Sequence, residues 1–228
     1  GRRPERALIV PLRLAQVLNL LALPKRARAV TEAALALAKS AQWKANLRHE
    51  RGASLRMLGE YTLAVAESEQ AVTLMVEAKA PPGELAAALH DLGWSHVALG
   101  QLAEARGRFE QALDLHEALA DDKPAVEVCK DLFAMGRVAL NEGRYDEALT
   151  SLTRSLEIIV ALVPQGEHPQ RARTLRELGV CRRLRGELLE AEALLNEAEA
   201  RFARIFGAHH VERALTLNEL AGIRQALG

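Results

Sequence analysis

One segment of this sequence recurs four times, with spacings of 41, 43 and 43 residues, and this repeat constrains the fold more than any other feature. The copies occupy residues 51–71, 92–112, 135–155 and 178–198. Each has a first glycine (52, 93, 136, 179), a second glycine seven residues later (59, 100, 143, 186) and then an alanine (64, 105, 148, 191). A recurrent skeleton of this length predicts small structural units that each pack on their neighbours.

The repeat continues in weaker form at both ends of the chain. A degenerate first copy aligns at Ala15, Ala22, Ala27 and Ala34, and a partial sixth copy aligns at Ala221 and Gly228. We therefore expect one continuous array over residues 1–228, without separate domains. Because the array starts and stops abruptly, we also expect it to be a segment of a larger protein.

Each copy has the pattern of two helices. In the second full copy, apolar or small residues recur at the three- and four-residue steps of a helix (Leu89, Leu92, Gly93, Val97, then Leu102, Ala105, Phe109, Ala112), and alternation of period two is absent. Breaks rich in proline and glycine separate the pairs. The prediction is helix pairs near 4–39, 42–79, 84–119, 124–162 and 168–206, then a lone helix at 210–227.

The two glycines of each copy admit two interpretations. A glycine-rich phosphate loop would occur once, after a strand, and would carry a Lys-Ser/Thr pair, and none of this holds here. In a helical repeat, by contrast, the second glycine can end the first helix in a left-handed conformation. The first glycine, such as Gly136, then lets the alanine of the next helix, Ala148, approach closely. We favour the helical repeat.

This skeleton resembles the tetratricopeptide repeat, through Leu92, Gly93, Gly100, Ala105, Phe109, Ala112, Tyr61 and Tyr145. The period exceeds the usual length of about 34 residues. It is similar to the longer repeats of kinesin light chain and nephrocystin-like bacterial proteins, especially at 166–179 and 207–221. The resemblance implies an all-α, right-handed superhelical α-solenoid of antiparallel helix pairs, of a type that serves as an adaptor.

Composition narrows the classes of partner. Thirty Lys and Arg balance thirty Asp and Glu, so no global field attracts nucleic acid or anionic lipid, although a local patch could do so. We expect no nucleic-acid and no membrane partner. The most apolar segment, residues 7–23, is short for a membrane span and carries polar residues, and no secretory signal opens the sequence, so we expect a cytoplasmic protein.

Residues that could carry chemistry do not form a recognisable site. Cys129 and Cys181 are too few for a disulfide framework or a thiolate zinc site. No HExxH spacing exists, and His168 and His210 share one register in the turns before helices, where capping or packing explains them better than metal binding. No serine lies in an elbow motif. We expect no enzyme activity, no metal and no cofactor.

The resemblance implies that the first helix of each pair lines a concave groove. Counted from the first glycine, the positions that face this groove hold many cations and two aromatic side chains, Trp94 and Phe133. The predicted binding residues are Asn46, His49, Arg56, His90, Trp94, Lys130, Phe133, Arg137, Arg173, Arg176, Arg183 and Asn218. A second interpretation stays open, in which the arginines only cover helix surface and pair with acids such as Glu50, Asp91 and Glu177.

The favoured function is therefore a non-catalytic scaffold or sensor module of a larger signalling or regulatory protein, which binds an acidic protein or peptide segment in a basic groove. The alternative is a receptor for a small molecule or short peptide that closes around its ligand and acts on an output domain outside this sequence. A last helix without a partner would expose Leu217, Leu220, Ile223 and Leu227, which predicts self-association through the terminal helices.

Overall fold

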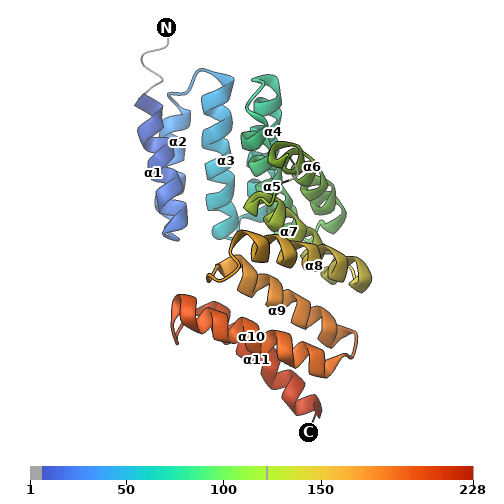
Figure 1. Cartoon of the computed structure of the whole chain (residues 1–228). Helices are drawn as coiled ribbons and strands as arrows, with labels where there is room; N and C mark the ends of the chain where they lie inside the picture. Colours follow the sequence, from blue (N-terminus) through green and yellow to red (C-terminus); the bar gives the residue numbers. More distant parts are fainter. Residues whose placement is uncertain (1–6, 122, 228) are drawn as a thin grey trace. The chain divides into compact units, whose positions relative to one another are not determined.

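The computed structural model describes residues 7–121 and 123–227, and over these residues the chain forms eleven helices and no strand (Figure 1). The helices are α1 (Ile9–Leu20), α2 (Pro24–Leu35), α3 (Ala41–Met57), α4 (Tyr61–Glu77), α5 (Pro82–Leu99), α6 (Leu102–Ala120), α7 (Val126–Asn141), α8 (Tyr145–Leu162), α9 (Pro169–Leu184), α10 (Leu188–Phe206) and α11 (Val211–Leu227). The predicted five pairs and lone last helix are confirmed within these residues. Residues 4–6 and Gly228, included in the predictions, lie outside the described part.

The second glycine of each copy ends the first helix of its pair. Four turns carry a glycine with a φ between 73° and 83°, at positions 59, 100, 143 and 186. This left-handed conformation suits glycine because it has no Cβ. In the degenerate first copy Ala22 occupies the same place with a φ of 54°, so an ordinary side chain adopts the conformation that the other turns assign to glycine.

The first glycine of each copy brings the two helices of a pair together. A Cβ on Gly136 would lie 2.6 Å from Cγ of Leu152 and 3.4 Å from the carbonyl oxygen of Ala148. A Cβ on Gly179 would meet Leu195 at 2.7 Å, and one on Gly93 would meet the ring of Phe109 at 2.6 Å. Distances this short leave no room for a side chain, so the predicted close packing is confirmed.

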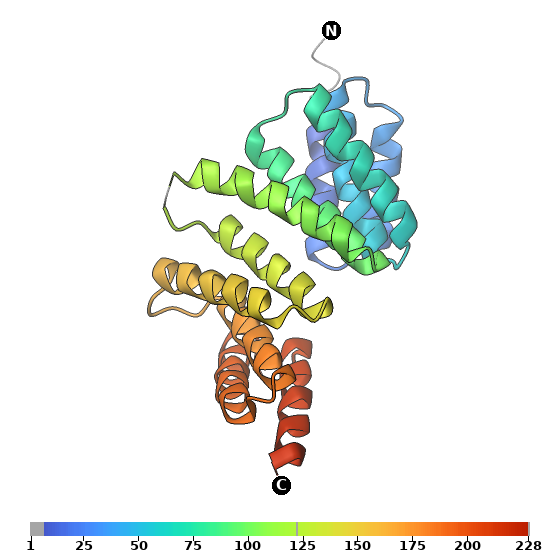
Figure 2. The ribbon, with the colours of Figure 1, turned by 90° about the vertical axis from the view of Figure 1, so that its right-hand side faces the viewer.

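The helices form two compact units, one up to Leu115 and one from His116, with the boundary inside α6. Within each unit, consecutive helices pack side by side as hairpins (Figure 2). Their cores combine small and large apolar residues, such as Ala45 with Met75 in the first unit and Ala198 with Phe202 in the second. That the whole chain forms one continuous array stays a prediction.

The last helix differs from the sequence expectation. Leu217 and Leu227 are exposed, but Leu220 and Ile223 are buried against Ala191 and other residues of α10, so the expectation that all four stand exposed is wrong. Residues of α10 therefore cover the side of α11 that carries Leu220 and Ile223. Among the described residues, no helix has both the length and the apolar character needed to cross a bilayer.

Candidate binding faces of the A helices

We call the first helix of each pair an A helix (α1, α3, α5, α7, α9, α11) and the second a B helix. The twelve predicted binding residues all lie on A helices. The first unit holds Asn46, His49, Arg56, His90 and Trp94, and the second holds Lys130, Phe133, Arg137, Arg173, Arg176, Arg183 and Asn218.

The A helices of the first unit border a groove of about 270 Å³. It brings together two predicted residues, Asn46 and His49, with residues of α1, α4 and α5, and its lining consists of Leu12, Arg13, Gln16, Asn46, His49, Glu50, Met75, Glu84 and Ala87. The groove is therefore mixed in charge rather than basic. Sequence reasoning missed Arg13 and Gln16 because the first copy lacks the glycines from which groove positions were counted.

His49 belongs to a polar cluster beside this groove. Its Nε2 lies 2.7 Å from Oδ2 of Asp91, and Arg56 approaches the other carboxylate oxygen at 3.7 Å. Burial raises the pKa of Asp91, but His49 and Arg56 lower it more, to about 2. Burial lowers the pKa of His49, yet Asp91 and Glu50 outweigh that effect and raise it above its ordinary value. The pair therefore favours imidazolium and carboxylate together.

Trp94 and His90 are held by each other and by the core. The indole Nε1 of Trp94 donates a hydrogen bond of 2.9 Å to Nε2 of His90, so this nitrogen acts as an acceptor. Both rings stand edge to face on Phe109, with centroids 5.3 Å and 5.4 Å away. Trp94 is half-buried. Its ring is thus fixed in place before any ligand arrives, which lowers the entropy cost of a contact with it.

In the second unit, one carboxylate of α11 joins two predicted arginines of α9. Glu212 accepts a hydrogen bond of 2.7 Å from Nε of Arg173 and another from Arg176. Arg176 also donates to Glu177 at 3.0 Å and lies over the ring of Phe202, 5.8 Å from its centroid. Burial raises the pKa of Glu212, but the two arginines lower it below its ordinary value. Arg176 therefore has a structural part in joining neighbouring repeats.

The other two arginines of this face also have acidic neighbours. Arg183 lies 3.0 Å from Glu219, and Arg137 lies 3.9 Å from Glu177. The sequence analysis named Glu177 as a possible partner but missed Glu212 and Glu219, since both come from α11, one repeat further along. The pairing of arginines with neighbouring acids is thus observed throughout this face.

The cations of this face still outnumber its acids. Lys130 is exposed and makes no ion pair with any residue in the described ranges 7–121 and 123–227. With the four arginines it makes five cations (Lys130, Arg137, Arg173, Arg176, Arg183) beside three carboxylates (Glu177, Glu212, Glu219). This face therefore carries a positive excess although the whole chain is neutral.

His168 lies near the same cations. Its Nδ1 accepts a hydrogen bond of 3.1 Å from the backbone N–H of Gln170, and His210 caps α11 in the same way from Glu212 at 3.2 Å, which confirms the predicted capping function. Burial, followed by the charges of Lys130 and Arg173, lowers the pKa of His168. The positive charges of Lys130 and Arg173 thus both reach the His168 side chain at the start of α9.

Phe133 does not stand exposed on the groove floor. Only 7% of its surface is exposed, so the expectation that it offers an open apolar anchor is wrong. The groove positions were counted from the first glycine and follow one side of an A helix. Neighbouring residues bury part of that side, including the position of Phe133. Asn218 on α11, in contrast, is exposed.

In the described part of the chain, the possible metal ligands and the two cysteine thiols offer little basis for chemistry. No group of three or more His, Cys, Asp or Glu side chains there could hold a metal ion. Cys129 and Cys181 are buried, and burial raises the pKa of each thiol. The Sγ of Cys129 lies 3.2 Å from the backbone oxygen of Ser155. Raised pKa values and burial make these thiols poor nucleophiles.

Comparison with known proteins agrees with the helical hairpins and their glycines. A family model described as tetratricopeptide repeat matches residues 43–118 and 130–203. No match was found among the curated proteins.

Several solved structures share the fold. Nearly identical TPR-like repeats of a protein described as a kinesin light chain from Podosopora anserina are 23% identical, with a TM-score of 0.70 over 91% of this chain and 100% of that one. BtubC (BKLC) from P. vanneervenii is 19% identical, with a TM-score of 0.71 over 86% and 80%. A Rap protein complexed with competence and sporulation factor is 17% identical, with a TM-score of 0.68 over 100% and 66%. Identities this low show the fold alone.

Proposed function

The chain belongs to the tetratricopeptide repeat family, and on that premise we propose that it is a non-catalytic scaffold that binds a protein or peptide segment along its A helices. Repeats of this family generally mediate protein–protein interactions. One solved protein of the same fold, a Rap protein, is described in complex with competence and sporulation factor. In this chain the scaffold would serve as the sensor or adaptor part of a signalling or regulatory protein.

An acidic segment is the ligand that suits the second unit. The observation that supports it is that five cations lie beside three carboxylates on the A-helix face of this unit. An incoming Asp, Glu or terminal carboxylate would form charge-assisted hydrogen bonds with the under-neutralised cations. Because exposed ion pairs are weak individually, the attraction would fix the orientation of the segment more than its affinity.

The proposal gives different functions to the predicted residues, according to their exposure and ion pairs. Lys130 is exposed at the end of this face, so it would bind ligand directly. Arg137 and Arg173, which are 40% and 39% exposed at their side chains, would share their carboxylate partners with the ligand. Arg176 is only 13% exposed and would act mainly in the fold. Asn218 would supply an amide for the ligand backbone.

A charge reversal at Lys130 tests this proposal. Lys130→Glu should weaken binding of acidic peptides by about tenfold, since it removes one attraction and adds a repulsion. Lys123→Glu is the matched control, because Lys123 is an exposed lysine of the same unit outside the A-helix face. The measurement is an array of short synthetic peptides that differ in acid content, screened at low and high salt with both variants. No enrichment of acidic peptides, or equal losses in both variants, would contradict the proposal.

A second candidate function is a receptor for a small molecule or short peptide that acts on an output domain. The groove of about 270 Å³ in the first unit favours it, because Arg13 lies on one helix and Glu84 on another, so that a ligand with both charges would be matched. Asn46 and His49 lie in the same groove, and Arg56, His90 and Trp94 lie on the same A helices. Native mass spectrometry of protein purified from cells separates the two functions: a tightly retained small ligand supports the receptor.

A further inference from the structure

The turn between α1 and α2 is unlike the turns of the later repeats. Leu20 and Leu21 are 86% and 63% exposed, and Leu23 is 39% exposed. In the four later turns the residue after the glycine is polar, namely Glu60, Gln101, Arg144 and Glu187, whereas Leu23 follows Ala22 here. The hairpin therefore ends in three adjoining exposed leucine side chains, which the repeat pattern does not require.

Further exposed apolar side chains follow one side of α1. Val10, Leu14 and Val17 are 68%, 45% and 50% exposed. With Leu21 they are spaced four, three and four residues apart, which places them on one helical stripe. We call the stripe and the turn together the α1 apolar edge, made of Val10, Leu14, Val17, Leu20, Leu21 and Leu23. Exposed patches that combine several large apolar residues mark interaction sites.

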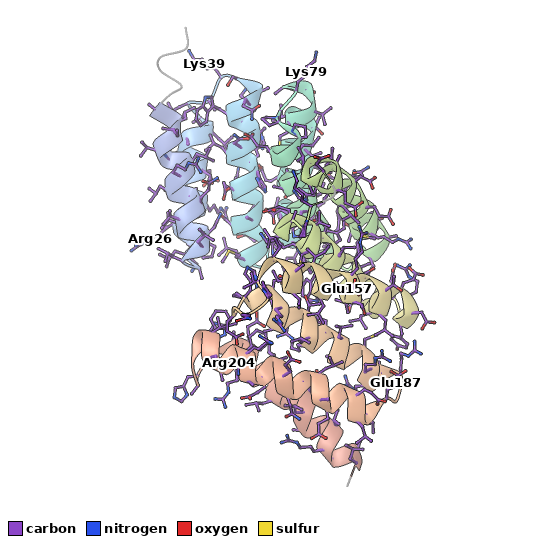
Figure 3. The ribbon with its side chains drawn as sticks, in the orientation of Figure 1. Arg26, Lys39, Lys79, Glu157, Glu187 and Arg204 are labelled. Carbon is purple, nitrogen blue, oxygen red and sulfur yellow. The ribbon has the colours of Figure 1, made fainter. Side chains whose placement is uncertain are left out.

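All charged residues within the segment that forms this edge are positive, and the acids that line a pocket with Lys25 and Arg28, namely Glu32 and Glu60, come from later in the chain. Residues 7–31 contain Arg13, Lys25, Arg26 and Arg28 but no Asp or Glu. Arg28 pairs with Glu60 at 2.8 Å, whereas Lys25 and Arg26 are exposed and make no ion pair with residues 7–121 or 123–227. Figure 3 shows Arg26 at the turn end of the α1–α2 hairpin, away from Lys39 at its other end. The chain is neutral overall, so this local excess of cations is a property of the edge.

We propose that the α1 apolar edge inserts into the interface of an anionic lipid bilayer, with Lys25 and Arg26 against the headgroups. Apolar side chains backed by Lys and Arg are the combination that holds a helix at such an interface, where leucine meets acyl chain and cation meets phosphate. The helix lies on the bilayer and does not cross it, since α1 has 12 residues. The inference is independent of the proposed peptide-binding face.

Charge favours lipid over the other occupants of this edge. A second helix could also cover it, because Leu47, which is equivalent to Val10 one repeat later, packs against Ala34 of α2 and against Ala38, which follows α2. Such a helix explains the stripe on α1 but not the leucines at the turn or the two exposed cations beside them. Two copies of this chain would bring like charges together at the same place, which is unfavourable.

The test is co-flotation of the full chain with vesicles of phosphatidylcholine alone or with about 30% phosphatidylserine, at low and high salt. We expect binding only to the anionic vesicles and weakening by salt. Leu20→Ser/Leu21→Ser should lower the bound-to-free ratio at least about tenfold, because two exposed leucines no longer enter the interface. Lys25→Glu/Arg26→Glu should lower it by at least as much.

Matched variants control for fold and total charge. Leu189→Ser/Leu215→Ser removes two leucines that are 70% and 52% exposed in the second unit, and Lys79→Glu/Lys123→Glu makes the same change in charge elsewhere. Both should float like the wild type. The proposal is overturned if the wild type does not float with anionic vesicles or if the edge variants float unchanged. It is also overturned if the wild type does not bind vesicles but light scattering shows a dimer, and this dimer is lost in the leucine variant.

Discussion

At the scale of single residues, backbone conformation explains much of the repeat. Gly59, Gly100, Gly143 and Gly186 all adopt a left-handed φ, which L side chains seldom adopt. Ala22 takes the same place at a φ of 54° and so bears a steric cost that its counterparts avoid. The first turn is therefore the least relaxed of the five equivalent turns in the described residues.

Ala22→Gly should stabilise the protein by about 0.5–1 kcal/mol, because the relief of the left-handed conformation exceeds the added entropy of the unfolded chain. The measurement is the free energy of unfolding from denaturant titration. Ala33→Gly, at an exposed position inside α2, is the control and should destabilise by about 1 kcal/mol. A loss of stability in both variants would show that Ala22 bears no strain.

The His49–Asp91 pair gives the second residue-scale prediction. Asp91 has a folded pKa of about 2, so its contribution is present above the unfolded value of 3.8 and is lost as pH falls toward 2. His49 has a raised pKa, so its contribution is present below 6.5 and is lost as pH rises through the folded value. His49→Gln should therefore destabilise by about 1–2 kcal/mol near pH 5 and less at pH 8. A cost that is the same at both pH values would contradict the charged pair.

At the scale of helices, neighbouring repeats are joined by ion pairs as well as by packing. Glu212 on α11 bridges Arg173 and Arg176 on α9, and these side chains are 14%, 39% and 13% exposed. In the same unit, Glu167 joins Arg201 and Arg204 of α10. The end of α10 that carries Arg204 lies opposite the end near Glu187 in Figure 3. Part of the charge of the second unit thus connects adjacent hairpins.

Glu212→Gln should destabilise the second unit by about 2 kcal/mol, because it leaves two arginines side by side without their carboxylate. This value lies between those usual for exposed and for buried ion pairs. Glu192→Gln is the control, since its partner Arg224 is 59% exposed at 3.0 Å, and it should cost less than about 0.5 kcal/mol. Thermal unfolding of both variants gives the comparison. Equal, small costs would mean that Glu212 is screened by solvent.

The close approach of α7 and α8 gives the other helix-scale prediction. Ala148 is fully buried and its carbonyl oxygen lies near Gly136. Ala148→Asp would bury a carboxylate without a partner and should destabilise by about 3 kcal/mol or more. Thr153→Asp, at an exposed position of the same helix, should change stability by less than about 0.5 kcal/mol. Unfolding of Ala148→Asp like the wild type would refute the helix pairing.

At the scale of the whole molecule, we expect a mutation in one hairpin to lower the stability of that hairpin and of its neighbours more than that of distant hairpins. In repeat proteins each unit rests on the units next to it, so a local loss spreads mainly to adjacent hairpins. Leu152 is fully buried in α8, and Leu152→Ala should cost about 2–5 kcal/mol. Hydrogen exchange should then accelerate in α7, α8 and α9 and stay close to wild type in α3 and α4. Equal acceleration in all these helices would indicate a single cooperative unit.

The sequence alone determined the helices and their pairing. Its period, the glycines at the turns and the alanines opposite Gly52, Gly136 and Gly179 depend on local conformation and on spacing along one helix, so they can be read without tertiary structure. The same holds for the histidine caps at His168 and His210, which repeat in register.

Only the tertiary structure decided which side chains are open and which charges are neutralised. Phe133 is buried although its position was counted as part of the groove, and Leu220 is covered by α10 although α11 is the last helix. The acids that neutralise Arg173 and Arg183 lie 39 and 36 residues further along, on α11. Burial and ion pairing join residues that are distant in sequence, and no local period encodes them.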